Sequence, residues 1–207
     1  MIKQKIDICP PPKDMLDETT DVQPKILHGS SRTEWRMWLS EHFESEKSVW
    51  LVFPNKSSNK PRISYNDAVE EALCFGWIDS NVKSYIEDSH IQHFTPRKPK
   101  STYSQPNRER LRWLEKENLL HPSVKAAIKG VLEESFVFPE DILQAIRSDA
   151  AAWENYSRYS PSYQRIRVAY IAGARSRPEE FQKRLANFIQ KAHNNKVIGY
   201  GGIEKHY

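Results

Sequence analysis

Hydrophobic positions in the first half of the chain alternate between helical and strand periods. After the capping pattern of residues 31–34, aromatic and apolar residues recur three and four positions apart, which predicts a helix. That face consists of Trp35, Trp38, Leu39, His42 and Phe43. A second helix is predicted to begin after Ser64 and to end at Gly76, because serine caps helix starts and glycine is frequent just after helix ends.

Three short β-branched and aromatic stretches predict strands between and after these helices. Residues 48–53 have the composition of a buried strand. Residues 82–86 and 91–95 alternate in polarity on either side of a polar tetrapeptide, which is typical of a hairpin. Residues 7–30 contain four prolines, so we expect a turn-rich arm there.

The second half of the chain keeps the helical period from Pro106 onward, so no further strand is predicted. The predicted helices cover residues 111–118, 124–132, 139–146, 149–156, 160–171 and 176–189. From Asn194 the chain is glycine-rich, and we expect a loose tail or a short docked strand. The fold class is therefore α+β, with a small mixed α/β part carrying a short sheet and an all-helical module after it.

The pattern of predicted elements divides the chain into four segments. They are an arm at 1–30, an α/β domain at 31–120, a helical module at 121–194 and a flexible tail at 195–207.

Composition excludes several classes of protein. The 207 residues are 38% hydrophobic and 28% charged, close to the average for globular proteins, which excludes collagen-like and wholly disordered chains. No apolar run is long enough to span a bilayer and no secretory signal is present, so we expect a cytoplasmic protein without membrane insertion. The net charge of +4 is too small to indicate a polyanion partner by itself.

The two cysteines, Cys9 and Cys74, form neither a disulfide framework nor a zinc site by spacing, and Cys74 is expected in the core. His90 and His93 are three residues apart, which places them on opposite faces of a strand, so no metal site is predicted. Phosphate-binding loops, nucleophile elbows and dinucleotide-binding glycine patterns are missing from the sequence. We therefore expect no cofactor and predict no catalytic motif.

Three motifs occur in a characteristic order: ALCFGWIDS at residues 72–80, FTPRKP at 94–99 and SQPNRER at 104–110. In order and spacing they resemble the YdeI/OmpD-associated family, also labelled bacteriocin-protection proteins. SPSY at residues 160–163, continuing to Arg184, is similar to the helical C-terminal module of that family, so the resemblance covers about residues 30–194. Lys98, Tyr103 and the pair Glu180-Phe181 depart from the family pattern. The resemblance implies an association with an outer-membrane porin and with bacteriocin or stress tolerance, and names no reaction.

The best candidate for a binding site is the loop around Arg97 and Lys98, together with Ser104 and Asn107 before the next helix. Two prolines stiffen this loop, and guanidinium, ammonium and helix N-terminal groups all bind anions. The structural alternative is an ion pair between Arg97 and Asp79, with Ser104 as an ordinary helix cap.

Trp77 and Asp79 alternate with Ile78 on an extended segment, so they point to the same side. In a binding site, Trp77 would stack on a flat ligand and Asp79 would orient Arg97 or act as a base. In a purely structural role, Trp77 would be core and Asp79 would cap a turn.

The most favoured function is non-catalytic binding of a small anionic ligand or a protein partner at Trp77, Asp79, Arg97, Lys98, Ser104 and Asn107. One alternative is nucleic-acid binding through the basic C-terminal helices, with Arg165, Arg167 and Arg184 on the phosphates. The other is an enzyme in which Asp79 is the general base and Arg97 binds the anionic substrate.

Overall fold

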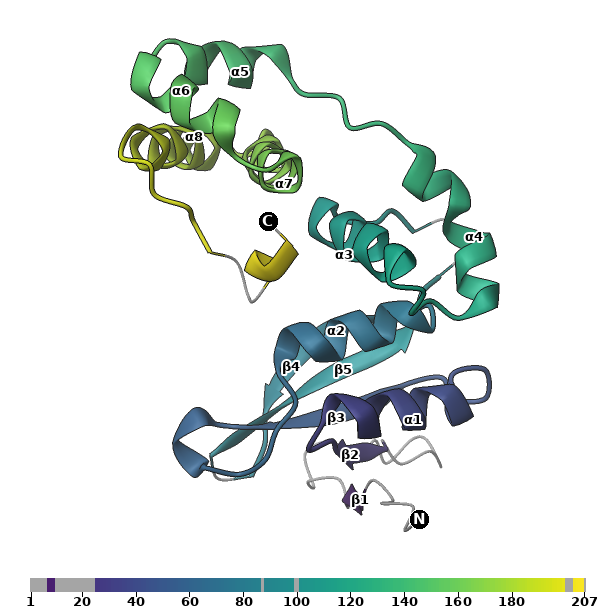
Figure 1. Cartoon of the computed structure of the whole chain (residues 1–207). Coiled ribbons are helices and arrows are strands. Elements are labelled where there is room, and N and C mark those ends of the chain that lie inside the picture. The colour runs from purple at the N-terminus through teal and green to yellow at the C-terminus, as the bar shows by residue number, and fades with distance from the viewer. Residues whose placement is uncertain (1–6, 10–24, 87, 99–100, 200–202, 207) are drawn as a thin grey trace. The chain divides into compact units, whose positions relative to one another are not determined.

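The computed structural model describes residues 7–9, 25–86, 88–98, 101–199 and 203–206 (Figure 1). The chain divides into two compact units. The first contains Met1–Thr102 and Leu114–Ala127, and the second contains Tyr103–Trp113 and Ile128–Tyr207. Most of the predicted N-terminal arm, including its four prolines, lies outside the described residues, as do Pro99, Gly201 and Gly202.

The first unit contains a five-stranded sheet in the order β1-β2-β3-β5-β4. Its strands are β1 (Asp7–Cys9), β2 (Ile26–His28), β3 (Val49–Pro54), β4 (Trp77–Ser84) and β5 (Ser89–Pro96). β2 pairs with β3 in parallel, and every other neighbouring pair is antiparallel. The sequence predicted β3 and the β4–β5 hairpin. It did not predict β1 and β2, because three residues are too few to show an alternating period.

Helices α1 (Arg32–His42) and α2 (Tyr65–Cys74) pack on the sheet, as the helical spacing predicts. The Ser31 and Ser64 hydroxyls accept hydrogen bonds from the backbone N–H groups three residues later, which caps both helix starts. The Trp35 ring of α1 stacks on Trp38 and lies 5.3 Å from the Phe94 ring of β5. These aromatic contacts fix α1 on the sheet face that carries Phe94.

The described residues of the second unit form helices joined by loops and contain no strand, which confirms the α+β class. The helices of the second half are α3 (Gln105–Lys116), α4 (Pro122–Glu133), α5 (Glu140–Arg147), α6 (Ala150–Arg158), α7 (Pro161–Ala172) and α8 (Pro178–His193). All six were predicted. α3 and α4 each contribute residues to both units, and α5 to α8 lie entirely in the second.

Apolar side chains from α5 to α8 form the core of the second unit. Ile142 and Ile146 come from α5, Tyr163 from α7 and Phe188 from α8, and all four are almost fully buried. Where the sequence predicted a loose tail or a docked strand, residues Ile203–His206 form a short 3-10 helix with Ile203 fully buried. None of the helices in the described ranges is long and apolar enough to cross a membrane.

Candidate functional site

A single glycine sets the position of the first candidate residues. Gly76 lies between α2 and β4 with a φ of 73°, a conformation that glycine adopts without steric cost. Its carbonyl accepts a 2.9 Å hydrogen bond from the backbone N–H of Arg97. This contact begins the β4–β5 ladder, in which Trp77 pairs with Pro96, Ile78 with Thr95 and Asp79 with Phe94.

Trp77 and Asp79 both face the helices, as the alternation predicts. The Trp77 side chain is 1% exposed, and its indole N–H donates to the Phe43 carbonyl at 3.1 Å. The Asp79 carboxylate accepts a 2.7 Å hydrogen bond from the Tyr65 hydroxyl of α2. Both residues are therefore held by the framework of the first unit.

Ile78 and Thr95 lie on the opposite side of the same strands and line a pocket of about 770 Å³. We call it the Arg97 pocket. Its lining also comprises Glu44, Ser45, Glu46, Lys47, Pro96, Arg97, Lys98, Ser101 and Thr102. Two of the six predicted site residues, Arg97 and Lys98, line this pocket, whereas Trp77 and Asp79 do not.

The Arg97 guanidinium contacts Ser101 and Thr102, which line the same pocket. One of its nitrogens donates to the Ser101 carbonyl at 3.2 Å, to the Ser101 hydroxyl at 3.0 Å and to the Thr102 carbonyl at 2.9 Å. The Ser101 hydroxyl in turn donates to the Lys98 carbonyl at 2.8 Å. Among the described residues no ion pair joins Arg97 to Asp79. The structural contacts of Arg97 are instead its hydrogen bonds to Ser101 and Thr102.

The charges around the Arg97 pocket are three cations and two carboxylates. Glu46 forms an ion pair with Lys25, so its charge is compensated from outside the lining. Lys47 and Lys98 are exposed and belong to none of the ion pairs formed by the described residues. Glu44 is also exposed and in none of these ion pairs, so the pocket presents two ammonium groups and one carboxylate to a ligand.

Ser104 and Asn107 belong to the second unit. The Asn107 backbone N–H lies 3.5 Å from the Ser104 hydroxyl, in the arrangement of a helix cap at the start of α3. The Asn107 side chain is 7% exposed and accepts a 2.9 Å hydrogen bond from Arg110. Ser104 and Asn107 therefore make contacts typical of a helix N-terminus, at the start of α3 in the second unit.

A family comparison matches part of the helical module. Residues 135–195 are similar to the family described as bacteriocin-protection, YdeI or OmpD-associated. Because of this match we call these residues the YdeI/OmpD-associated module. Residues 27–127 match a domain of unknown function, DUF8412, and the three motifs at residues 72–110 fall within that second match. The named family therefore covers a shorter segment than the expected residues 30–194. No curated protein and no solved structure matches the chain.

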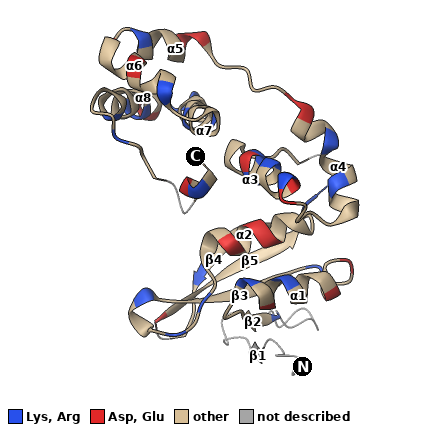
Figure 2. Cartoon of the chain, viewed as in Figure 1, with Lys and Arg blue, Asp and Glu red and all other residues tan. Residues whose placement is uncertain are grey.

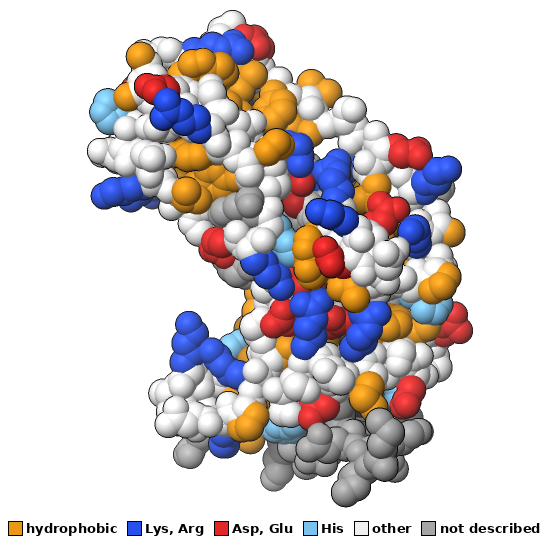
Figure 3. Space-filling view, in the orientation of Figure 1, with side chains coloured by type: hydrophobic (Ala, Val, Ile, Leu, Met, Phe, Trp, Pro, Cys, Tyr) orange, Lys and Arg blue, Asp and Glu red, His pale blue; other side chains and the backbone are white. Residues whose placement is uncertain are grey.

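Within the YdeI/OmpD-associated module, the arginines considered for nucleic-acid binding make contacts inside the chain. Arg167, which is 4% exposed, lies against the Tyr163 ring. The Arg184 guanidinium lies 3.8 Å from the centre of the Tyr170 ring and donates to Glu180 at 2.7 Å. On the face shown in Figure 3, basic and acidic side chains are intermixed.

Arg165, the third of these arginines, extends from α7 of that module to a buried carboxylate of α3. Its guanidinium makes two hydrogen bonds of 2.7 Å to Glu109, which is 4% exposed. The pair raises the pKa of Arg165, because the carboxylate accepts hydrogen bonds from the charged guanidinium. Arg165 thus compensates a buried charge of its own unit.

Other candidate chemistry is limited in the described part of the chain. His90 stacks on Phe53, His93 stacks on Trp50, and burial lowers the pKa of both imidazoles. The described residues contain no group of three or more His, Cys, Asp or Glu placed to hold a metal ion. Association of the YdeI/OmpD-associated module with bacteriocin tolerance in this chain stays a prediction.

The Cys74 thiol is expected to be inert in the folded protein. Cys74 is fully buried, as predicted, and burial raises its pKa from 9.0 to about 12. At neutral pH this rise lowers the thiolate fraction by about a thousandfold. In a Cys9→Ser variant, iodoacetamide should label Cys74 slowly in buffer and rapidly in urea. Rapid labelling of the folded variant would contradict the burial.

Sequence reasoning missed Lys47 and the hydroxyl groups of the Arg97 pocket. Lys47 lies fifty residues before Arg97, and only strand pairing brings the two segments together. In the antiparallel β3–β5 ladder Val49 pairs with Phe94, so the residues before Val49 run alongside those after Phe94. To predict that Lys47 lies near Arg97, one would need to know the register of β3 against β5. Local hydrophobic periodicity does not specify that register.

Proposed function

We propose that the first unit binds a small carboxylate- or phosphate-bearing molecule in the Arg97 pocket, without converting it chemically. The observation that carries this proposal is the presence of Lys47 and Lys98 on one pocket, beside a loop held in place by Arg97. Ammonium groups attract anions as point charges, and hydroxyl groups add directional hydrogen bonds.

The size and lining of the pocket support a small-molecule ligand. Its volume of about 770 Å³ lies in the range of pockets that hold metabolites. Ser45, Thr95, Ser101 and Thr102 add hydroxyl-bearing residues to the same lining, and Ile78 and Pro96 add apolar residues. This combination suits an organic anion with several oxygen atoms, such as a di- or tricarboxylate.

The position of Asp79 favours binding over catalysis. A general base must lie within hydrogen-bond reach of the proton that it removes. Asp79 lies on the helix-covered side of β4 and contacts Tyr65, whereas Ile78 and Thr95 line the pocket on the other side. An enzyme that uses Asp79 and Arg97 on one substrate is therefore less well supported than a binding protein.

Replacing Lys98 by glutamine should weaken citrate binding by about tenfold at low salt, because one charge-assisted contact is lost. Isothermal titration calorimetry of the full chain with citrate measures this change. The matched control is Lys56→Gln, which removes an exposed lysine of the same unit outside the pocket lining.

The two variants separate a specific site from general electrostatic attraction. The control variant should bind citrate like the unmodified protein, and thermal unfolding should be the same for both variants. Equal weakening in Lys98→Gln and Lys56→Gln would mean that the anion is held by net charge alone. If neither citrate nor inorganic phosphate binds to the protein at millimolar concentration, a protein partner is favoured instead.

A further inference from the structure

A second pocket lies in the second unit, and α7 and α8 of the YdeI/OmpD-associated module supply most of its lining. Its volume is about 360 Å³, enough for a small organic molecule. We call it the α7–α8 pocket. Its polar lining includes Arg167, Tyr170, Glu180, Lys183, Arg184 and Asn187. Every residue of its lining belongs to the second unit, so this pocket is separate from the Arg97 pocket.

Arg167 places a cation in the wall of this pocket although the residue is 4% exposed. Its guanidinium carbon lies 5.5 Å from the Tyr163 ring centre and 5.9 Å from the Tyr170 ring centre. Two aromatic rings stabilise a partly desolvated guanidinium and fix its orientation.

Arg184 is the second cation of this pocket, and its contacts hold it against the Tyr170 ring. It lies over that ring at 3.8 Å, and it donates to the Tyr170 carbonyl at 2.8 Å and to Glu180 at 2.7 Å. These contacts leave the guanidinium little rotational freedom. Binding an anion therefore costs little further side-chain entropy of Arg184. The hydrogen bond from Arg184 also lowers the pKa of Glu180, which is therefore ionised at neutral pH.

Lys183 adds a third cation at the edge of the α7–α8 pocket. It is exposed and takes part in none of the ion pairs of the described chain, although its charge contributes to the lowered pKa of Glu180. Glu180 lines the same pocket and the Glu204 carboxylate lies against Gly199 of the lining, so two carboxylates offset part of the charge of the three cations. Ile171, Phe188 and Ile198 form an apolar part of the same lining.

We propose that the α7–α8 pocket binds a phosphate monoester, with the phosphate on Arg167, Lys183 and Arg184 and the organic group on the apolar wall at Phe188. A phosphate monoester presents three acceptor oxygens to these three cations, whereas a monocarboxylate presents two. Guanidinium groups match the oxygen geometry of phosphate. The apolar wall favours an ester with a compact ring over inorganic phosphate.

Titration of the full chain with phenyl phosphate tests this proposal by ¹H–¹⁵N NMR. The side-chain amide of Asn187 and the Arg184 Nε–H report on the α7–α8 pocket itself, so binding at the Arg97 pocket does not interfere. Both signals should shift and saturate, and phenyl phosphate should bind more tightly than inorganic phosphate.

Lys183→Gln and Lys191→Gln form a matched pair of variants. Each removes one exposed lysine from α8, and only Lys183 lines the pocket. Lys183→Gln should raise the Kd for phenyl phosphate about tenfold, and Lys191→Gln should leave it unchanged. Lys98→Gln should also leave it unchanged, which separates this proposal from the function proposed for the first unit.

Three results would overturn the proposal. The first is that the Asn187 and Arg184 signals do not shift at millimolar phenyl phosphate. The second is that Lys183→Gln and Lys191→Gln weaken phenyl phosphate binding equally, and the third is equal affinity for phenyl phosphate and inorganic phosphate. The last result would remove the organic group from the proposed ligand. Because Lys183 is exposed, its variant is expected to fold, and an unchanged thermal transition verifies this.

Discussion

Replacing Trp77 by alanine is expected to lower the free energy of unfolding of the first unit by about 3–5 kcal/mol. The side chain is 1% exposed, so its removal leaves a cavity in a core that cannot fully collapse. The Trp38 ring lies edge-on to Trp77 at 5.9 Å and loses this contact. Urea denaturation of the full chain, followed by far-ultraviolet circular dichroism, measures the effect.

Trp77→Phe is the informative companion to this substitution. Phenylalanine fills most of the cavity and cannot donate to the Phe43 carbonyl, so we expect a loss of about 1–2 kcal/mol. This variant should fold and bind citrate with unchanged affinity, because Trp77 faces the helices and the Arg97 pocket lies on the other side of β4. Loss of citrate binding in folded Trp77→Phe would instead place Trp77 at the ligand.

Replacing Arg32 by methionine is expected to cost about 3 kcal/mol. Two adjacent carboxylates of α2 are buried, with Glu70 at 0% and Glu71 at 2% exposed. Arg32 donates to Glu70 at 2.8 Å and to Glu71 at 2.5 Å, so its removal leaves buried negative charge without its principal partner. Figure 2 shows acidic segments of α2 in red and basic segments of α1 in blue. Thermal and urea unfolding measure the loss.

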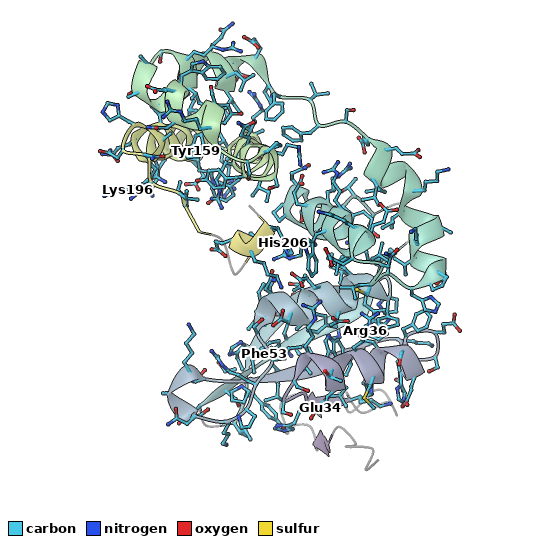
Figure 4. The ribbon with its side chains drawn as sticks, in the orientation of Figure 1. Glu34, Arg36, Phe53, Tyr159, Lys196 and His206 are labelled. Carbon is cyan, nitrogen blue, oxygen red and sulfur yellow. The ribbon has the colours of Figure 1, made fainter. Side chains whose placement is uncertain are left out.

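A double-mutant cycle separates the lost ion pair from lost packing. In an Arg32→Met background, Glu70→Gln removes one of the uncompensated charges and should restore about 1–2 kcal/mol. In the unmodified chain, the same Glu70→Gln change should destabilise. Arg36, labelled in Figure 4, still donates to Glu71 at 2.7 Å and limits the total loss. Additive effects of the two substitutions would contradict a direct coupling between Arg32 and Glu70.

Local sequence patterns were sufficient to predict most of the helices and strands of this fold. Caps such as Ser31 and Ser64 and the apolar faces of six later helices are encoded within one or two helical turns, so the sequence predicted them. The β4–β5 hairpin was also predicted, but its first strand begins at Trp77 rather than at residue 82. A register shift between Asp79 and Val82 interrupts the alternation there, which hid the first part of the strand.

Contacts between distant segments were decided by the tertiary structure. Residues 64–79 contain acids and no base, and only the packing of α1 on α2 brings Arg32 and Arg36 to these acids. Likewise, only the β3–β5 register places Lys47 beside Arg97 in one pocket. Trp77 and Asp79 are close to Arg97 in the ladder and still lie on the opposite side of the sheet.

The sequence by itself therefore determined the α+β class, the presence of each α-helix and the resemblance of the C-terminal module to the YdeI/OmpD-associated family. The tertiary structure determined which charges are compensated inside each unit and which line a pocket. The physical reason is that helix caps and hydrophobic periods act over a few residues, whereas ion pairs and pockets depend on side chains brought together by strand register and helix packing.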